Sequence, residues 1–257
     1  MKRITLLSFI SVVFVTNLFA WGAQGHRIVP DVAYDNLTCK ARHHVDKVLG
    51  TRGIIYYSTW PDDIKSDTIY PTSGDWHYQD LDANMSDSAL MATLTHYPTK
   101  GGNLFRVTDS LINVLQHDNT QQDALKFIVH FVADRFCPMH IAHMDDHGGN
   151  RVKMKWFGQN TNLHSVWDAK IIEYNKYSYS EYATYLEDTF GDEKKEIKKL
   201  SREDELRYNY QLVDSIYQYH QTWSGNTYHY AYHWSYLMNR QLYMAGIKLA
   251  VLLNSLY

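Results

Sequence analysis

The sequence predicts a mainly α-helical protein, a single-domain multi-helix bundle with one short β-hairpin. Apolar residues recur at helical intervals through several segments of the 257-residue chain, whereas the alternation that marks a strand appears once. No linker rich in Gly, Ser or Pro interrupts residues 21–257, so we expect them to form one domain.

Residues 1–20 have the pattern of a secretory signal peptide. Lys2 and Arg3 precede a largely apolar run, and Ala20 supplies a small residue at the expected cut. The alternative is an uncleaved membrane anchor, but the run is short for a bilayer span and no second span follows. Cleavage would make Trp21 the mature N-terminus. We therefore expect a periplasmic or secreted protein with no membrane association after cleavage.

The charge and the unusual residue counts narrow the function. The full chain has a formal net charge of −3, and loss of the two basic leader residues makes it −5. This balance argues against a duplex-DNA binder held by a basic face. Fourteen histidines in an exported chain suggest metal binding. Cys39 and Cys137 are too few to define a metal site, and their pairing stays open.

The first half of the chain predicts three helices. Apolar residues at helical intervals mark residues 31–49, with Gly50 just past the end, and residues 104–116 repeat the pattern. Residues 124–136 are apolar nearly all round, which predicts the central buried helix. Thr120 to Asp123 resembles a capping box at its start, and Pro138 should end it.

The second half predicts the hairpin and further helices. Arg151 to Phe157 alternates apolar and basic residues and Gly158 closes it, which is typical of a strand or hairpin arm. His164 to Tyr174 has a helical pattern, and residues 193–200 form a charged helix or loop. Residues 201–219 and 235–253 predict two long helices.

Two histidine–aspartate pairs carry the strongest chemical signal. His130 and Asp134 are four residues apart, as are His164 and Asp168, so each pair shares one face of a helix; His140 lies between the pairs. A carboxylate on an apolar helix is costly to bury unless it is paired or bound to metal. A buried His–Asp hydrogen bond explains either pair alone, but the occurrence of two pairs favours metal binding.

The ordered motifs resemble those of the single-strand-specific zinc nucleases, also called 3′-nucleotidases, of nuclease S-one and P-one type. The resemblance covers essentially all of residues 21–257 and implies a phospholipase C/nuclease-like fold. The family usually has His-Gln before the proline, where this chain has Phe136-Cys137. The matching motifs are Trp21-Gly22-x-x-Gly25-His26, Trp60-x-Asp62, His77-Tyr78, His130-x-x-x-Asp134, Pro138-Met139-His140, Gly148-Gly149-Asn150 and Asn162-Leu163-His164-x-x-Trp167-Asp168.

The resemblance implies three Zn²⁺ ions, a close pair and a third. It gives one ion of the pair the ligands Asp62, His77, His130 and Asp134. It gives the neighbouring ion His26 with the α-amino group and carbonyl of Trp21, and Asp134 bridges the two. It gives the third ion His140, His164 and Asp168. The Trp21 amine can bind metal only after the leader is removed, and His143 and His147 are alternatives to His140.

The resemblance also implies the reaction and its substrates. A zinc-activated water would attack phosphorus in single-stranded DNA or RNA and leave 5′-phosphate products, with 3′-nucleotides as further substrates. The implied catalytic residues are Asp62, Asp134 and Lys65, although Lys65 is equally well interpreted as a solvated surface lysine. The implied substrate contacts are Tyr78, Asp80 and Asn150, for which core packing and turn geometry are the alternatives.

Two rival functions remain. Zinc phospholipase C enzymes resemble this family in using three zinc ions. They have a longer spacing than that between Trp21 and His26, and a glutamate in place of Asp168. A non-catalytic zinc-binding or adhesion protein would leave the bridging carboxylate and open coordination positions unexplained. The sequence favours a monomer and leaves the preference between DNA and RNA open.

Overall fold

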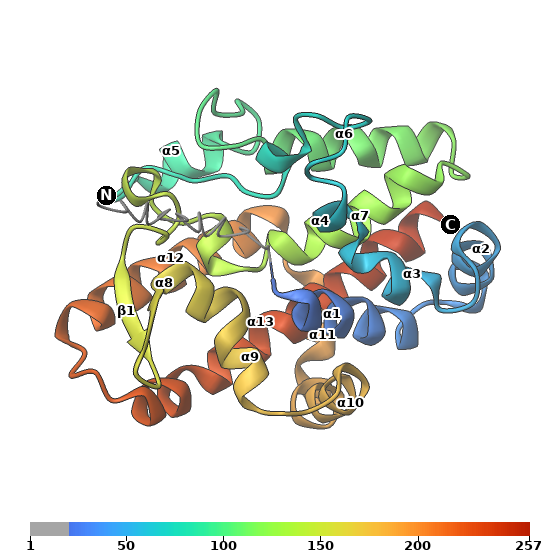
Figure 1. The fold of residues 1–257 in the computed structure, drawn as a ribbon. Coiled ribbons are helices and arrows are strands. Elements are labelled where there is room, and N and C mark those ends of the chain that lie inside the picture. Colours follow the sequence, from blue (N-terminus) through green and yellow to red (C-terminus); the bar gives the residue numbers. More distant parts are fainter. Residues whose placement is uncertain (1–20) are drawn as a thin grey trace, which may run out of the picture.

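The computed structural model describes residues 21–257, and the predicted leader lies outside them. The described residues are mainly helical with one two-stranded sheet, which confirms the predicted fold class (Figure 1). No helix among them is long and apolar enough to span a membrane.

The elements follow one another with short connections. The α-helices are α1 (Ala23–Asp35), α2 (Cys39–Leu49), α3 (Gly53–Tyr56), α4 (Trp60–Asp63), α5 (Asp87–Ala92), α6 (Leu104–His117), α7 (Gln122–Asp134), α8 (Leu163–Ser165), α9 (Ile171–Tyr174), α10 (Tyr179–Phe190), α11 (Lys194–Lys199), α12 (Arg202–Thr222) and α13 (Thr227–Leu256). The 3₁₀ turns are η1 (Tyr57–Thr59), η2 (Ser73–Trp76), η3 (Pro138–His140), η4 (Met144–Asp146) and η6 (Gly191–Glu193), and η5 (Val166–Lys170) is a π-helix. The strands are β1 (Lys153–Trp156) and β2 (Gln159–Asn162).

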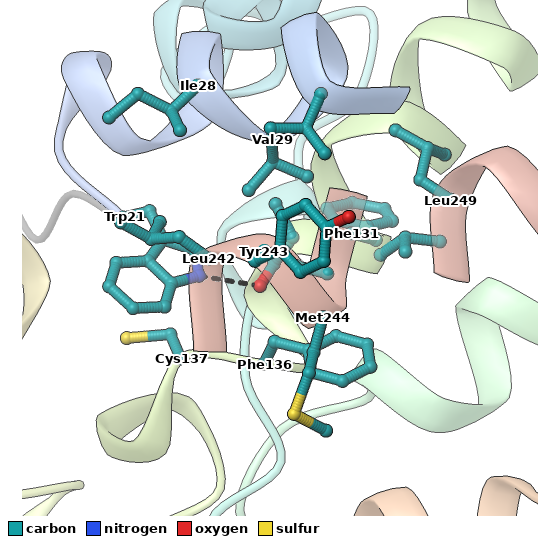
Figure 2. Packing of buried hydrophobic residues seen from close by; sticks show 14 of the residues in the cluster. Trp21, Ile28, Val29, Phe131, Phe136, Cys137, Leu242, Tyr243, Met244 and Leu249 are labelled. Carbon is teal, nitrogen blue, oxygen red and sulfur yellow. Dashed lines mark hydrogen bonds between the residues drawn. The ribbon is translucent and has the colours of Figure 1, made fainter. Parts of the chain in front are cut away.

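Three helices form the centre of the molecule. The long helix α13 passes through the middle of the bundle, and both α1 and α7 pack against it (Figure 1). Gly246 makes the approach of α1 to α13 possible, because a Cβ there would lie 2.6 Å from Cβ of Val32. The side chains of Trp21, Phe131 and Leu242 meet in the core between these helices (Figure 2).

The first predicted helix is wrong in its extent. The chain forms two helices where the pattern predicted one over residues 31–49, and the first begins earlier, at Ala23. Asn36 ends α1, and Thr38 starts α2 by accepting the backbone N–H of Ala41 with its side chain. A capping side chain inside the apolar pattern breaks the helix, although the apolar spacing continues through it.

The buried central helix is confirmed, but its predicted capping box is wrong. Every residue of α7 from Ala124 to Asp134 is buried, and Pro138 opens a separate 3₁₀ turn after it. The N-cap of α7 is Gln121, whose side chain makes no capping hydrogen bond, while Thr120 donates its hydroxyl to Asp118. Thr120 thus completes the turn that precedes the helix.

The hairpin follows the predicted arm. β1 pairs with β2 in antiparallel register, with Lys153 opposite Asn162 and Trp156 opposite Gln159. Phe157 and Gly158 form the tight turn with positive φ angles of 47° and 81°. The loop before β1 contains Gly148-Gly149-Asn150, so the hairpin extends from one edge of the site described below.

The remaining helices include one that the periodicity missed. Residues 163–174 are helical as predicted, with a π-helical segment around Asp168. The charged segment forms the short α11, and the two long C-terminal helices are present as α12 and α13. α10 was not predicted, although Ser178 and Glu181 form a full capping box at its start.

Candidate metal centre

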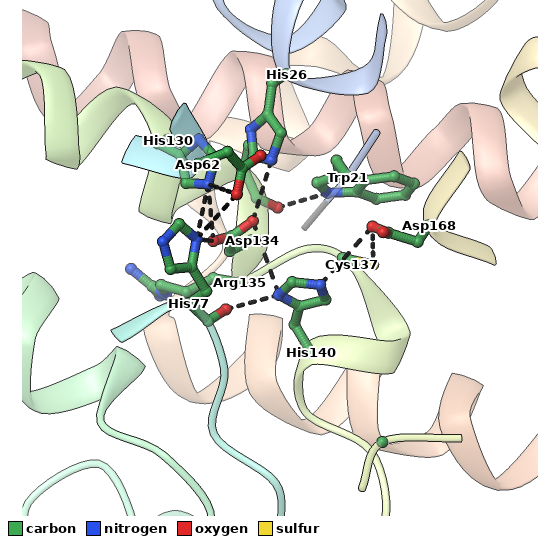
Figure 3. A network of polar contacts seen from close by, with 12 residues as sticks. Trp21, His26, Asp62, His77, His130, Asp134, Arg135, Cys137, His140 and Asp168 are labelled. Carbon is green, nitrogen blue, oxygen red and sulfur yellow. Dashed lines mark hydrogen bonds and ion pairs between the residues drawn. The ribbon is translucent and has the colours of Figure 1, made fainter. Parts of the chain in front are cut away.

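Four buried donors converge where α7 ends. His130 and Asp134 lie one turn apart on α7, Asp62 comes from α4, and His77 follows η2 (Figure 3). Nδ1 of His77 lies 2.9 Å from Nε2 of His130, 3.2 Å from Oδ2 of Asp134 and 3.6 Å from Oδ1 of Asp62. Nε2 of His130 lies 3.3 Å from Asp134 and 3.7 Å from Asp62. These distances bracket the ~3.3 Å that separates the ligands of a tetrahedral zinc ion.

Backbone carbonyls fix the tautomers of three histidines. Nδ1 of His130 lies 2.6 Å from the carbonyl of Ser58, Nδ1 of His140 2.6 Å from that of His77, and Nδ1 of His164 2.8 Å from that of Gly148. A carbonyl only accepts hydrogen bonds, so each Nδ1 carries the proton and each Nε2 keeps its lone pair. This arrangement is typical of metal-binding histidines, whose second nitrogen donates to a neighbouring acceptor.

Asp134 faces donors on two sides. Its Oδ2 points to His77 and His130, while its Oδ1 lies 3.4 Å from Nε2 of His26 on α1. The ring of His26 stacks on that of His130 with centroids 3.6 Å apart. The groups His26–His130–Asp134 and Asp62–His77–His130 each have ligand atoms close enough to hold a metal ion. The two groups share His130, and Asp134 directs one oxygen toward His26 and the other toward His77 and His130, so this carboxylate can bridge two ions.

Trp21 is anchored beside these donors. Its indole is fully buried and donates Nε1–H to the carbonyl of Ala133, 2.6 Å away, directly before Asp134. The amide of Gly22 donates to the carbonyl of Asp168 at 2.7 Å. The Trp21 side chain is therefore tied to α7, and the backbone of the next residue, Gly22, is tied to the π-helical segment. The indole of Trp21 thus packs in the core, and the same residue also lies next to the metal-binding donors.

A third group of donors includes one residue that the sequence analysis did not assign. Nε2 of His140 lies 3.7 Å from Oδ1 of Asp168, and Sγ of Cys137 lies 3.9 Å from the same oxygen. These three residues can also hold a metal ion. The His164 ring lies beside that of His140, with centroids 5.2 Å apart. The sequence left the pairing of Cys137 with Cys39 open, and in the structure both are free thiols.

The buried polar atoms suit a cation. Among the residues that the structure describes, Nε2 of His26, Nε2 of His140 and Oδ1 of Asp134 face other donors of the site and are buried without a hydrogen-bond partner. Leaving one such atom unsatisfied costs about 1–3 kcal/mol, so three in one site require a compensating interaction. A metal ion satisfies lone pairs that no protein donor reaches, and the residues fit zinc, which binds nitrogen and oxygen ligands.

Burial sets the protonation states of these groups. It lowers the pKa values of His26, His77 and His140, and nearby positive groups lower them further. Burial raises the pKa of Asp134 to about 6 against the opposing effect of His130, and it raises that of Asp168. These three histidines are thus held neutral, the form that binds metal. Burial also lowers the pKa of His130, but the charges of Asp134 and Asp62 outweigh it, so the pKa of that histidine is raised.

The remaining predicted site residues surround the donors. The Lys65 ammonium lies 2.6 Å from Oδ1 of Asp62 and is one-fifth exposed. Tyr78 is half-buried and donates its hydroxyl to Asp75. Burial, with the charge of Asp146, raises the pKa of Asp80 to about 8. Asn150 donates its side-chain amide to the carbonyl of His147 at 2.8 Å, as a turn residue does.

His143 and His147 belong to none of the three groups. Nε2 of His143 lies 3.5 Å from Oδ1 of Asp214 on α12, and its ring lies against Tyr217. His147 is exposed, with a φ of 55°. Of the three histidines in this segment, His140 is therefore the one that faces the other donors.

Comparisons with known proteins agree with this geometry. A sequence model of the family described as S1/P1 Nuclease matches residues 21–257. Relatives include Endonuclease 4 of Arabidopsis thaliana, 27% identical over 172 residues, which are 62% of this chain and 58% of the relative. Nuclease S1 of Aspergillus oryzae is 25% identical over 194 residues, 73% of this chain and 67% of the relative. Nuclease P1 of Penicillium citrinum is 27% identical over 164 residues, 58% of this chain and 57% of the relative. The chain spans less than two thirds of the length of the plant relatives.

Proposed function

Because the chain belongs to the S1/P1 nuclease family, we propose that it is a zinc-dependent phosphodiesterase. It hydrolyses single-stranded DNA and RNA as an endonuclease, leaves 5′-phosphate products and accepts 3′-nucleotides. The names Nuclease S1 and Nuclease P1 of two relatives support a nuclease activity. The phospholipase C alternative is not favoured, since the family match extends over residues 21–257.

One observation carries the proposal: Asp134 lies between two groups of buried donors. His77 and His130 lie at distances typical of zinc ligands from each other, from Asp62 and from Asp134, and His26 faces the other oxygen of Asp134. An ordinary buried ion pair does not need two histidines whose facing nitrogens lie 2.9 Å apart. Two ions on either side of one carboxylate would make the site suitable for phosphodiester hydrolysis.

We assign three Zn²⁺ ions to these donors. The first is held by Asp62, His77, His130 and Asp134, the second by His26, Asp134 and the N-terminus of the mature chain, and the third on the His140 side. The proposed ligands are Trp21, His26, Asp62, His77, His130, Asp134, His140, His164 and Asp168. Cys137 lies close enough to Asp168 to be a further ligand, although burial raises the pKa of its thiol.

Asp134, Asp62 and Lys65 each have a separate role in the proposed reaction. Zinc bound here lowers the pKa of a bound water toward neutrality and offsets negative charge on the phosphate. The Asp134 carboxylate holds the two donor sets in register and accepts a hydrogen bond from the attacking water. Asp62 positions the Lys65 ammonium, 2.6 Å from Oδ1, where it stabilises the developing charge on a phosphate oxygen.

The substrate contacts explain a preference for single strands. The half-exposed ring of Tyr78, next to His77 in the chain, offers a face on which an unpaired base can stack. Asp80, two residues after Tyr78, and Asn150, on the loop after η4, are the proposed polar contacts to that base. A paired base in a duplex has no free face for stacking, so such a site selects denatured strands.

The leader and the site together suggest where the enzyme works. If residues 1–20 are removed during export, the α-amino group of Trp21 becomes available, so processing would activate the enzyme. We therefore propose a periplasmic or secreted enzyme that acts as a monomer without membrane attachment.

Product analysis separates the candidate functions. Zinc-loaded protein, expressed with its leader, is incubated with denatured DNA, RNA, a 3′-nucleotide and phosphatidylcholine. Release of oligonucleotides with 5′-phosphate ends supports the nuclease. Release of diacylglycerol would support the phospholipase instead, and zinc binding without hydrolysis of any substrate would leave a non-catalytic zinc protein.

A further inference from the structure

The loop of residues 146–150 presses against the His140 side of the site. The carbonyl of Gly148 accepts the Nδ1–H of His164 at 2.8 Å and so fixes which nitrogen of this ring carries the proton. His147, Gly148 and Gly149 all have positive φ angles, from 55° to 80°. A Cβ on Gly148 would lie 2.4 Å from the carbonyl oxygen of Met139, so only glycine fits at this position of the loop.

One carboxylate holds this loop in place. Oδ1 of Asp146 accepts the backbone N–H of Gly149 at 2.7 Å and the hydroxyl of Tyr217 at 2.8 Å. Tyr217 comes from α12, 71 residues further along the chain. Its ring also lies 4.1 Å from that of His143, whose carbonyl accepts the N–H of Gly148 at 3.0 Å. The tyrosine therefore contacts the first residue of the loop and, at His143, the segment that precedes the loop.

We propose that Tyr217 is a positioning residue that holds His164 in its metal-binding orientation through Asp146 and the Gly148 carbonyl. The hydroxyl of Tyr217 orients Asp146, Asp146 fixes the amide of Gly149, and the Gly148 carbonyl then meets the His164 ring. This inference rests on the proposed function, in which His164 is a zinc ligand. It deepens that function, because it assigns to Tyr217 on α12 a role in the binding of the third zinc ion.

The expected effect follows from what the substitution removes. In Tyr217→Phe the ring still packs against His143, but Asp146 loses one of its two donors. Loss of a partner behind a metal-binding histidine typically lowers metal affinity about 10- to 100-fold. Only the third ion, which His164 binds, should respond, because His130, a ligand of the first ion, has the carbonyl of Ser58 as its partner.

The test compares two tyrosines that each donate to a carboxylate. Tyr217→Phe is matched with Tyr243→Phe, whose hydroxyl donates to Glu187 at 3.0 Å between α13 and α10. Zinc bound per chain is measured by elemental analysis during titration with a chelator, and kcat and KM are measured on a short single strand. We expect Tyr217→Phe to release one zinc at about 10-fold lower chelator concentration and to lower kcat more than KM changes, while Tyr243→Phe does neither.

A second pair of variants keeps the test decisive if Tyr217→Phe folds poorly. Asp146→Asn retains an oxygen that can accept from both donors, whereas Asp146→Ala does not. We expect the asparagine variant to retain most of the affinity for the third zinc and the alanine variant to lose it.

Three outcomes would be decisive against one claim or the other. Unchanged zinc release and kcat in Tyr217→Phe overturn the positioning role. Equal weakening of all zinc ions together with a lower melting temperature shows a purely structural tyrosine and also overturns it. A wild-type protein that binds no zinc overturns the proposed function itself, which the wild-type titration reveals before any variant is compared.

Discussion

Nε2 of His26 lies 3.4 Å from Oδ1 of Asp134, on the side of the carboxylate opposite to His77 and His130. Asp134 thus joins a donor from the first helix to donors from the central helix and from the loop after η2. Segments more than 100 residues apart in sequence meet at this one side chain.

Removal of the bridging charge should disable the site. Asp134→Asn keeps the shape of the side chain but gives one side an amide NH₂ in place of an oxygen. We expect zinc content to fall and hydrolysis of single strands to drop at least ~100-fold, more than the loss of an outer partner causes. Asp123→Asn, in the first turn of the same helix, is the control. Full zinc content with near-normal activity in Asp134→Asn would contradict the bridging role.

Lys65 distinguishes a catalytic cation from a surface lysine. Its ammonium is 2.6 Å from Asp62, so Lys65→Gln removes a positive charge beside the proposed phosphate position. We expect kcat to fall about 100-fold with unchanged zinc content, the loss typical of one transition-state donor. Lys199→Gln, on exposed α11, should have no effect. Activity of Lys65→Gln within twofold of wild type would establish the surface interpretation.

The α-amino group of Trp21 should be needed to bind one of the zinc ions. A protein with one extra alanine before Trp21 keeps the buried indole but has no α-amino group at that position. We expect it to bind one zinc fewer than protein processed from the full leader and to be nearly inactive. Mass spectrometry checks the N-terminus of both preparations. Equal zinc content in the two would remove Trp21 from the ligand set.

Asp80 should make the stability of the folded protein depend on pH. Burial and Asp146 raise its pKa from 3.8 to about 8, so folding favours the protonated form. The unfolded chain ionises first as pH rises, and the wild type therefore loses stability between about pH 4 and pH 8. Asp80→Asn cannot ionise. Its stability advantage in denaturant unfolding should grow across that window and then stay constant. Parallel stability profiles for the two proteins would contradict a raised pKa.

Sequence patterns predicted an element best where its own residues have a clear apolar spacing or alternation. The apolar surface of α7 identified the buried helix, and the alternation from Arg151 to Phe157 identified the hairpin. The break at Thr38 was missed because the apolar spacing continues across it. Apolar spacing did not predict α10, although Ser178 and Glu181 form a capping box at its start.

The candidate site was predicted by spacing within a helix and by resemblance across the chain. The four-residue spacing of His130 and Asp134 placed both on one face. The approach of Asp62, His77 and His26 depends on tertiary packing, which no local pattern encodes. The carbonyls of Ser58 and Gly148 that fix the histidine tautomers are backbone groups, so the sequence carries no sign of them. Cys137 was not predicted as a metal ligand, because Asp168, which it contacts in the fold, is 31 residues away in sequence.

The most direct test of the central claim is the hydrolysis of heat-denatured and duplex DNA by leader-processed, zinc-loaded protein, with and without a zinc chelator. We expect rapid cleavage of denatured DNA, slow cleavage of the duplex, and loss of both on chelation with recovery when zinc is restored. Intact denatured DNA after incubation with protein of confirmed zinc content would contradict the nuclease function.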